Sequence, residues 1–342
     1  MKTPAAILVE QKAPLELAEV EIPALRYGQV LVEVAVTRIC GSQLGEIDGV
    51  KGPDRFLPHL LGHEAGGTVW EVGPEVRHVK PGDRVVLHWR PGRGIDAGGS
   101  VYDWAGRTVN AGNITTFQRY TVVSENRLTV VPPDVDFEIC ALLADTLTTG
   151  FGVITNDAKV RVAESVAVIG CGGIGLGVVL GASLAGAYPI IAVDIQTHKL
   201  DKAREYGATH TINSALTDFA SDARQILGGS VDVVIDGTGN PTVLEMAYTL
   251  TSDTGRCVIF GVMPADRKLS INTLPLHFGK VLTGSHGGES RPAEDIPRLV
   301  RMMKAKRFDP AGFVSHRIPL EQINDGIARM RSGEVVHCMV RF

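Results

Sequence analysis

The sequence predicts an α/β protein with two domains, one a β-barrel-like domain and the other a doubly wound parallel sheet. Three observations lead to this prediction. The 342 residues are more than one hydrophobic core ordinarily holds. The first 150 or so residues are rich in short β-branched runs broken by glycine and proline. The middle of the chain instead alternates apolar strands with helical segments, which is typical of a parallel sheet.

The composition is that of an ordinary globular protein, with 44% hydrophobic and 21% charged residues. A net charge of -4 gives no electrostatic reason to expect nucleic acid or an anionic membrane as partner. We expect no membrane span, since no apolar run reaches ~18 residues, and no signal peptide at the N-terminus. The five cysteines are scattered without a CxxC pair, which predicts reduced thiols and a cytoplasmic location.

The N-terminal part predicts an all-β barrel-like domain. Strand patterns recur between turn signals, at residues 29–36, 67–72 and 83–88. The stretch from Arg90 to Asn113 holds six glycines, and its length predicts a functional or lid loop.

The rest of the chain predicts alternating strands and helices followed by a return segment. The expected strands are 165–169, 190–194, 232–236 and 256–261, and the expected helices include 174–185 and 198–206. After Gly287-Gly288 we expect helices at 292–306 and 320–330 and a final strand at 335–341.

The run Val168–Gly175 reads as a strand, a glycine turn and the start of a helix. Gly170 permits a tight turn, Gly172 lets the backbone approach a pyrophosphate, and Gly175 lets the helix pack against its strand. The helix N-terminus then directs unsatisfied N–H groups at the phosphates. Asp194, 19 residues after Gly175, ends the next strand, and its carboxylate would bind ribose hydroxyls and repel a 2′-phosphate. The pattern therefore predicts NAD binding in preference to NADP.

Cys40 follows one predicted strand and His63 precedes another, and thiolate and imidazole are ligand types that zinc prefers. On spacing alone, a structural role for both residues stays open. Asp145 lies in an apolar, threonine-rich stretch, where it could also serve as a helix N-cap.

Taken together, these segments resemble the zinc-dependent medium-chain dehydrogenase/reductase family, that is, the zinc-containing alcohol dehydrogenases. The resemblance covers essentially the whole chain, and its markers are Cys40-Gly41-Ser42, Gly62-His63-Glu64, Val79–Val85, Gly170–Gly175 and Gly237–Asn240. It implies a GroES-like catalytic domain over 1–149 and 289–342. It also implies a Rossmann domain over 150–288 and an active site in the cleft between the domains.

By this resemblance, Cys40 and His63 match two ligands of a catalytic zinc. Asp145, followed by Thr-Leu-Thr-Thr-Gly-Phe, is similar to the third ligand of the tetrameric secondary-alcohol dehydrogenases. Glu64 matches a residue that can ligate the metal during ligand exchange, and Ser42 matches the hydroxyl that takes the substrate proton. Three protein ligands leave a fourth position open, as a catalytic zinc requires.

The resemblance also implies the contacts of the cofactor. The glycine turn supplies Gly170, Gly172, Gly173, Ile174 and Gly175. Asp194 and Lys199 match residues near the ribose, and Thr238, Gly261 and Val262 match positions that line the adenosine and nicotinamide ribose. Gly261 and Val262 can equally be a plain strand end.

Four departures from the family pattern matter. No cysteine lies between Arg90 and Asn113, so the structural zinc is absent and we expect one zinc ion per chain. Gln43 replaces the usual aspartate, and we expect its amide oxygen to accept the His63 N–H. Gly45 stands where a proton-relay histidine is frequent. His337 falls near the position where some members have an arginine that binds the pyrophosphate.

The lobe that lacks the cysteines carries Arg90, Arg93 and Arg107, which either bind a phosphate or carboxylate of the substrate or form a solvated surface. We therefore expect an NAD-linked dehydrogenase of a secondary alcohol, with a sugar, polyol or cyclitol favoured over a simple alcohol or aldehyde. A zinc-free quinone or enone reductase and a non-catalytic dinucleotide-binding protein are the alternatives. A homodimer or homotetramer is expected by analogy alone.

Overall fold

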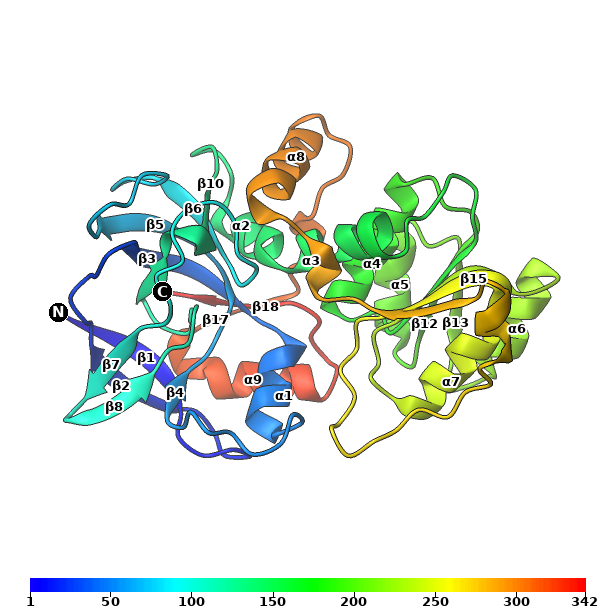
Figure 1. Cartoon of the computed structure of the whole chain (residues 1–342), viewed down its shortest axis with the longest axis horizontal. Helices are drawn as coiled ribbons and strands as arrows, with labels where there is room; N and C mark the ends of the chain where they lie inside the picture. Colours follow the sequence, from blue (N-terminus) through cyan, green and yellow to red (C-terminus); the bar gives the residue numbers. More distant parts are fainter. The chain divides into compact units, whose positions relative to one another are not determined.

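The computed structural model describes residues 1–342, which form two compact units. The first unit comprises Met1–Asp145 and Arg291–Phe342, and the second comprises Thr146–Ser290. The expected boundaries, after residues 149 and 288, lie within four residues of this division. Figure 1 follows the chain by colour, and both termini lie in the first unit.

The first unit is built on two sheets. A closed barrel has the strand order β1-β2-β7-β8-β4, formed by β1 (Lys2–Leu8), β2 (Glu16–Glu21), β7 (Val101–Trp104), β8 (Arg107–Asn110) and β4 (His59–Leu60). A second, seven-stranded sheet has the order β10-β6-β5-β3-β18-β17, with β9 also paired to β3. Its strands are β10 (Leu128–Val130), β6 (Arg84–His88), β5 (Glu64–Val72), β3 (Gln29–Ile39), β18 (Cys338–Arg341), β17 (His316–Pro319) and β9 (Tyr120–Ser124).

The helices of the first unit pack on these sheets (Figure 1). They are α1 (Gly41–Asp48), α2 (Phe137–Ala144), α8 (Pro292–Lys304) and α9 (Ile323–Arg331), with short 3₁₀ turns at Glu125–Arg127, Ala311–Phe313 and Leu320–Gln322. The helix α2 contacts β3, β5 and β6. Gly66 permits this contact, since a Cβ there would lie 2.6 Å from the Cys140 Cβ and the Phe137 carbonyl oxygen.

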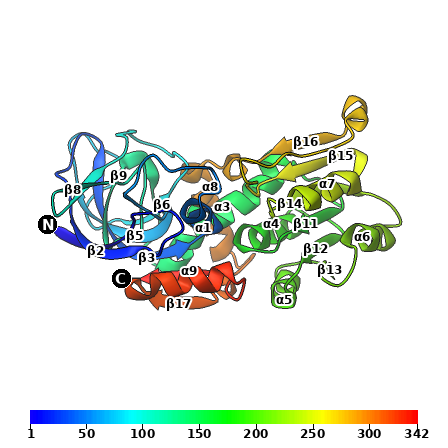
Figure 2. The same cartoon turned by 90° about the horizontal axis from the view of Figure 1, so that it is seen from below.

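The second unit is a six-stranded parallel sheet with the order β13-β12-β11-β14-β15-β16. Its strands are β11 (Val166–Ile169), β12 (Ile190–Asp194), β13 (His210–Asn213), β14 (Val231–Asp236), β15 (Thr251–Ile259) and β16 (Val281–Gly284). Its helices are α3 (Thr146–Gly152), α4 (Gly173–Leu184), α5 (Thr197–Glu205), α6 (Phe219–Leu227) and α7 (Pro241–Leu250), with shorter turns at Val153–Asp157, Leu274–Phe278 and Gly287–Glu289. The helices α4 and α5 contact one another, as do α6 and α7, and Figure 2 shows the sheet with these helices around it.

The strand order places a switch point between β11 and β14, where the chain direction along the sheet reverses. In parallel α/β sheets, ligands bind beyond the carboxyl ends of the strands at such a point. The glycine turn after β11 and the turn Gly237–Gly239 after β14 both lie there. This is the predicted doubly wound sheet.

Two expectations about the chain need correction. The stretch from Arg90 to Asn113 is not one loop, because β7 and β8 form a hairpin inside it. In addition, the helical stretch Phe137–Asp157 is long and apolar enough to cross a membrane, although no such run was expected. Because 83% of its most apolar window is buried within the protein, it matches the core helix of a soluble protein.

Candidate metal centre and dinucleotide site

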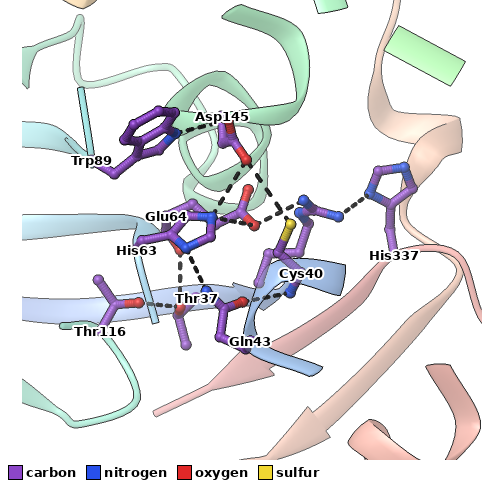
Figure 3. A network of polar contacts seen from close by, with 10 residues as sticks. Thr37, Cys40, Gln43, His63, Glu64, Trp89, Thr116, Asp145 and His337 are labelled. Carbon is purple, nitrogen blue, oxygen red and sulfur yellow. Dashed lines mark hydrogen bonds and ion pairs between the residues drawn. The ribbon is translucent and has the colours of Figure 1, made fainter. Parts of the chain in front are cut away.

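Four metal-ligating side chains from distant parts of the sequence meet in the first unit. One potential ligand atom from each of Cys40, His63, Glu64 and Asp145 lies within 4.8 Å of all the others. Cys40 follows β3, His63 and Glu64 stand at the start of β5, and Asp145 follows α2. Figure 3 shows these side chains turned toward one another.

Two of the three spacings between these atoms match those around a tetrahedral zinc ion, and the third is slightly wider. The His63 Nε2 lies 3.4 Å from Asp145 Oδ2 and 3.7 Å from Glu64 Oε1, and the Cys40 Sγ lies 4.0 Å from Asp145 Oδ2. Tetrahedral zinc with bonds of about 2.0–2.3 Å holds its ligand atoms about 3.3–3.8 Å apart. One thiolate, one imidazole and carboxylates are also the donor types that zinc takes.

Gln43 contacts His63 at Nδ1, the ring nitrogen away from the cluster, but not through the atom that we expected. The Gln43 Oε1 accepts the backbone N–H of Cys40 at 2.8 Å, so it is the amide nitrogen that faces His63 Nδ1. The expected bond from His63 to the amide oxygen is therefore wrong in this geometry. The cause is local, because Cys40 is the N-cap of α1 and its N–H needs an acceptor from the third helical residue.

Glu64 is fully buried and forms an ion pair with Arg38, a residue that the sequence did not single out. The Arg38 Nη2 lies 2.8 Å from Glu64 Oε1, and the two side chains are 1% and 0% exposed. Burial opposes the charge on Arg38, but Glu64 and the other nearby acids outweigh it and raise the pKa of Arg38. The guanidinium therefore stays charged beside the candidate ligands.

His337 completes this buried group. The Arg38 Nη1 donates to His337 Nδ1 at 3.1 Å. Burial and the positive charge of Arg38 lower the pKa of His337 well below its ordinary value, so the ring is neutral and can accept. The expected position of His337, near that of the pyrophosphate-binding arginine of some family members, does not describe its contacts here, because its ring packs edge-on against Phe313 and accepts from Arg38.

Asp145 divides its two oxygens between different partners. Its Oδ2 faces Cys40 and His63, whereas its Oδ1 accepts the indole N–H of Trp89 at 3.0 Å (Figure 3). Trp89 directly follows β6, and no sequence pattern links it to Asp145. The contact keeps one carboxylate oxygen directed at the cluster.

The remaining residues predicted for this unit do not all lie near the cluster. Ser42 is exposed at the second position of α1, two residues after Cys40. Arg90 follows Trp89, and its guanidinium lies 5.7 Å from that ring. Arg93 is exposed on the loop, and Arg107 lies over Trp104 within the β7–β8 hairpin. The structure therefore brings only Arg90 close to a residue that touches the cluster.

The glycine turn of the second unit has the geometry that the sequence predicted. Gly170 has a φ of +91°, and a Cβ on Gly175 would lie 2.0 Å from the Gly170 carbonyl oxygen. A Cβ on Gly172 would meet nothing within 4 Å, which leaves open space in front of the turn. The helix α4 begins at Gly173-Ile174 without a side-chain cap, so its N–H groups remain available to an anion.

Asp194 ends β12 with its carboxylate already fixed. Its two oxygens accept the backbone N–H groups of Cys171 at 2.8 Å and Gln196 at 2.9 Å. Lys199 lies in the first turn of α5. After β14, the Thr238 hydroxyl donates to Asp236 at 2.7 Å. A Cβ on Gly261 would lie 2.4 Å from the Gly239 nitrogen, and Val262 is exposed.

Comparison with known proteins places both units. The family described as "Alcohol dehydrogenase GroES-like domain" matches residues 26–133, and the family "Zinc-binding dehydrogenase" matches residues 173–305. The chain is 32% identical over 378 residues to "Alcohol dehydrogenase class-3" of Cereibacter sphaeroides, with both proteins covered completely. The chain belongs to the zinc-containing alcohol dehydrogenase family.

Solved structures of this family agree with the fold. An alcohol dehydrogenase zinc-binding domain protein from Burkholderia ambifaria superposes with a TM-score of 0.92 at 32% identity, covering 100% of this chain and 99% of that one. Benzyl alcohol dehydrogenase from Acinetobacter calcoaceticus gives 0.90 at 28% identity, with the same coverage. The predicted GroES-like and Rossmann folds are confirmed. As a zinc-containing alcohol dehydrogenase, the chain is an enzyme acting on CH–OH donors, in a family that uses zinc and NAD(H).

Proposed function

We propose that this chain interconverts a secondary alcohol and its ketone with NAD(H), at one zinc ion held by Cys40, His63 and Asp145. The observation that carries the proposal is the meeting of these three side chains, with Glu64, within 4.8 Å. Zinc bound there supplies a Lewis acid that lowers the pKa of an alcohol hydroxyl. NAD(H), when bound, would supply the acceptor for the hydride that leaves the carbinol carbon.

Residues of the chain then accept the substrate proton and complete the set of metal ligands. Ser42 accepts the substrate proton at its hydroxyl, and its exposure lets water carry the proton onward because Gly45 offers no relay group. Glu64 would be the fourth protein ligand during ligand exchange, and its ion pair with Arg38 would keep it off the metal at other times. A zinc-free reductase would not require this buried set of potential metal ligands.

The cofactor preference rests on Asp194. A buried carboxylate held by two backbone N–H groups keeps lone pairs for ribose hydroxyls and repels a 2′-phosphate. We therefore propose NAD in preference to NADP. One zinc per chain is supported because the residues described hold a single cluster of three or more potential ligands.

The substrate class is proposed on narrower ground. We infer a secondary alcohol that bears further polar groups, such as a sugar, polyol or cyclitol, because Arg90 lies beside Trp89 next to the cluster. A simple secondary alcohol or an aldehyde is the competing class.

The five cysteines are all free and buried, which supports a reducing, cytoplasmic compartment.

The proposal is tested on purified protein. We expect about one zinc per chain, and NADH formation in a screen of simple secondary alcohols, polyols, sugars and sugar phosphates, with NADP much less effective. The variant Asp145→Ala should lose both zinc and activity while it stays folded, whereas Asp103→Ala in the β7–β8 hairpin should keep both. Stoichiometric zinc in Asp145→Ala would count against the ligand set, and equal use of NADP would count against Asp194.

A further inference from the structure

The Gln43 side chain faces two groups that both need an acceptor, and it has only one oxygen. Gln43 is 1% exposed, so bulk solvent does not reach its amide group. Its Oε1 accepts the Cys40 N–H at 2.8 Å, and its amide nitrogen faces His63 Nδ1. Both contacts are drawn in Figure 3.

Zinc binding changes what His63 requires on that side. Its Nε2 is the nitrogen that lies 3.4 Å from Asp145 Oδ2, inside the cluster, and is therefore the ligand atom. A neutral imidazole that ligates through Nε2 carries its proton on Nδ1. That N–H then points at the amide N–H₂ of Gln43, which places a donor against a donor.

Rotation of the amide does not resolve the conflict. A half-turn would bring the Gln43 oxygen to His63 Nδ1, but it would turn the N–H₂ group onto the Cys40 N–H. A carboxylate at this position would serve both donors, because each of its oxygens accepts. With glutamine, one buried N–H lacks an acceptor in either orientation, and such a group is costly.

We propose that Gln43 is a positioning residue that weakens zinc binding, since it cannot satisfy Cys40 N–H and His63 Nδ1–H together. This rests on the proposed zinc ligation. The consequence is a catalytic zinc held less tightly than a carboxylate at position 43 would hold it. The partners of a ligating histidine typically change metal affinity by about 10–100-fold.

Zinc affinity, measured by competition with a chromogenic chelator, tests the proposal without using activity. We expect Gln43→Glu to bind zinc at least about tenfold more tightly than the parent chain. Gln43→Met, uncharged and of similar length, should change the affinity less than about threefold, because it removes one good bond together with the donor conflict. Gly41→Glu controls for added charge, since Gly41 is exposed next to Cys40 and a Cβ there meets nothing within 4 Å.

Each outcome either supports or overturns the proposed role of Gln43. If Gln43→Glu binds zinc no more tightly than Gly41→Glu does, the proposal is overturned. So would a loss of about tenfold or more in Gln43→Met, because the Gln43 oxygen would then be supporting His63. If the parent chain itself binds no zinc, the proposed function fails and this inference fails with it. Zinc binding by the parent with no gain in Gln43→Glu defeats the inference alone.

Discussion

At the scale of single residues, the candidate centre is a balance of buried charges. Cys40, Asp145 and Glu64 lie beside one buried guanidinium, and in the deprotonated forms that bind a metal they carry three negative charges against its one positive charge, an excess that a dication would neutralise. Arg38 neutralises part of the charge of Glu64. Removal of either partner would leave the charge of the other buried and unpaired. The deprotonated ligand set therefore matches the charge of a divalent metal.

Trp89 gives the first prediction at this scale. Its indole N–H occupies one oxygen of Asp145 and leaves the other to the cluster. The variant Trp89→Phe keeps most of the ring volume but loses the donor, so Asp145 can turn and the zinc affinity should fall by about tenfold. Chelator competition measures this, with Trp104→Phe in the β7–β8 hairpin as control. Unchanged affinity in Trp89→Phe would mean that the indole does not orient Asp145.

At the scale of elements, backbone hydrogen bonds to one buried carboxylate fasten the loop after β6. The Glu125 carboxylate accepts the backbone N–H groups of Arg77 and His78 at 2.6 Å and of Ile95 at 2.9 Å. Gly92 N–H also bonds to the Asn126 carbonyl oxygen at 2.7 Å. One carboxylate thus joins two stretches of chain in the lobe where the family pattern has a structural zinc.

The pKa of Glu125 makes this fastening dependent on pH. Burial by itself would raise the pKa, but the three backbone N–H groups outweigh it, and the pKa lies below its ordinary value. The stabilisation is therefore complete above the unfolded pKa of about 4.3 and is lost as the pH falls through the folded pKa. We expect Glu125→Gln to lower the free energy of unfolding by about 2 kcal/mol at pH 7.

Urea unfolding at pH 7 and at about pH 3.5 measures this effect. The difference between the parent and Glu125→Gln should shrink at the lower pH, because the unfolded parent then binds a proton at Glu125 more readily than the folded parent does. A difference that is the same at both values would show that the charge of Glu125 contributes nothing. Glu75→Gln, at an exposed glutamate in the same lobe, should change the stability at neither pH.

The sequence predicted the elements at the centre of the parallel sheet better than those at its edges. The strand β12 (Ile190–Asp194) matches its expected range, and α4 (Gly173–Leu184) differs from it by one residue at each end, because apolar runs and glycine punctuation mark both. The strands β13 and β16 were missed, since each has four residues and lies at an edge of the sheet. A short edge strand has one paired side and needs no continuous apolar pattern.

The candidate ligands could be named from the sequence only through the resemblance to a family. Cys40 and Asp145 are separated by 105 residues, and no local pattern joins them. Arg38 was out of reach for a different reason. An arginine in a strand ordinarily reads as a surface residue, and only the pairing of β3 with β5 buries it beside Glu64. The orientation of the Gln43 amide likewise depends on Cys40 being a helix N-cap.

At the scale of the whole molecule, the second unit ends in an edge strand that offers a surface to another chain. The strand β16 pairs only with β15, so one side of its backbone is free for strand pairing. Val281 in β16 is 43% exposed, and Leu274 and Phe278 just before it are 61% and 72% exposed. An unpaired edge with an apolar border favours a symmetric contact with a second copy.

We therefore expect the chain to form at least a homodimer through β16. The variant Val281→Lys places a charge on this edge, and the molar mass measured by light scattering after size-exclusion chromatography should fall toward that of a monomer. Leu216→Lys is the matched control, because Leu216 is 79% exposed beside β13 at the opposite edge of the same sheet. If the two variants keep the same mass as the parent, the contact lies elsewhere. If the parent is itself a monomer, β16 does not pair in solution.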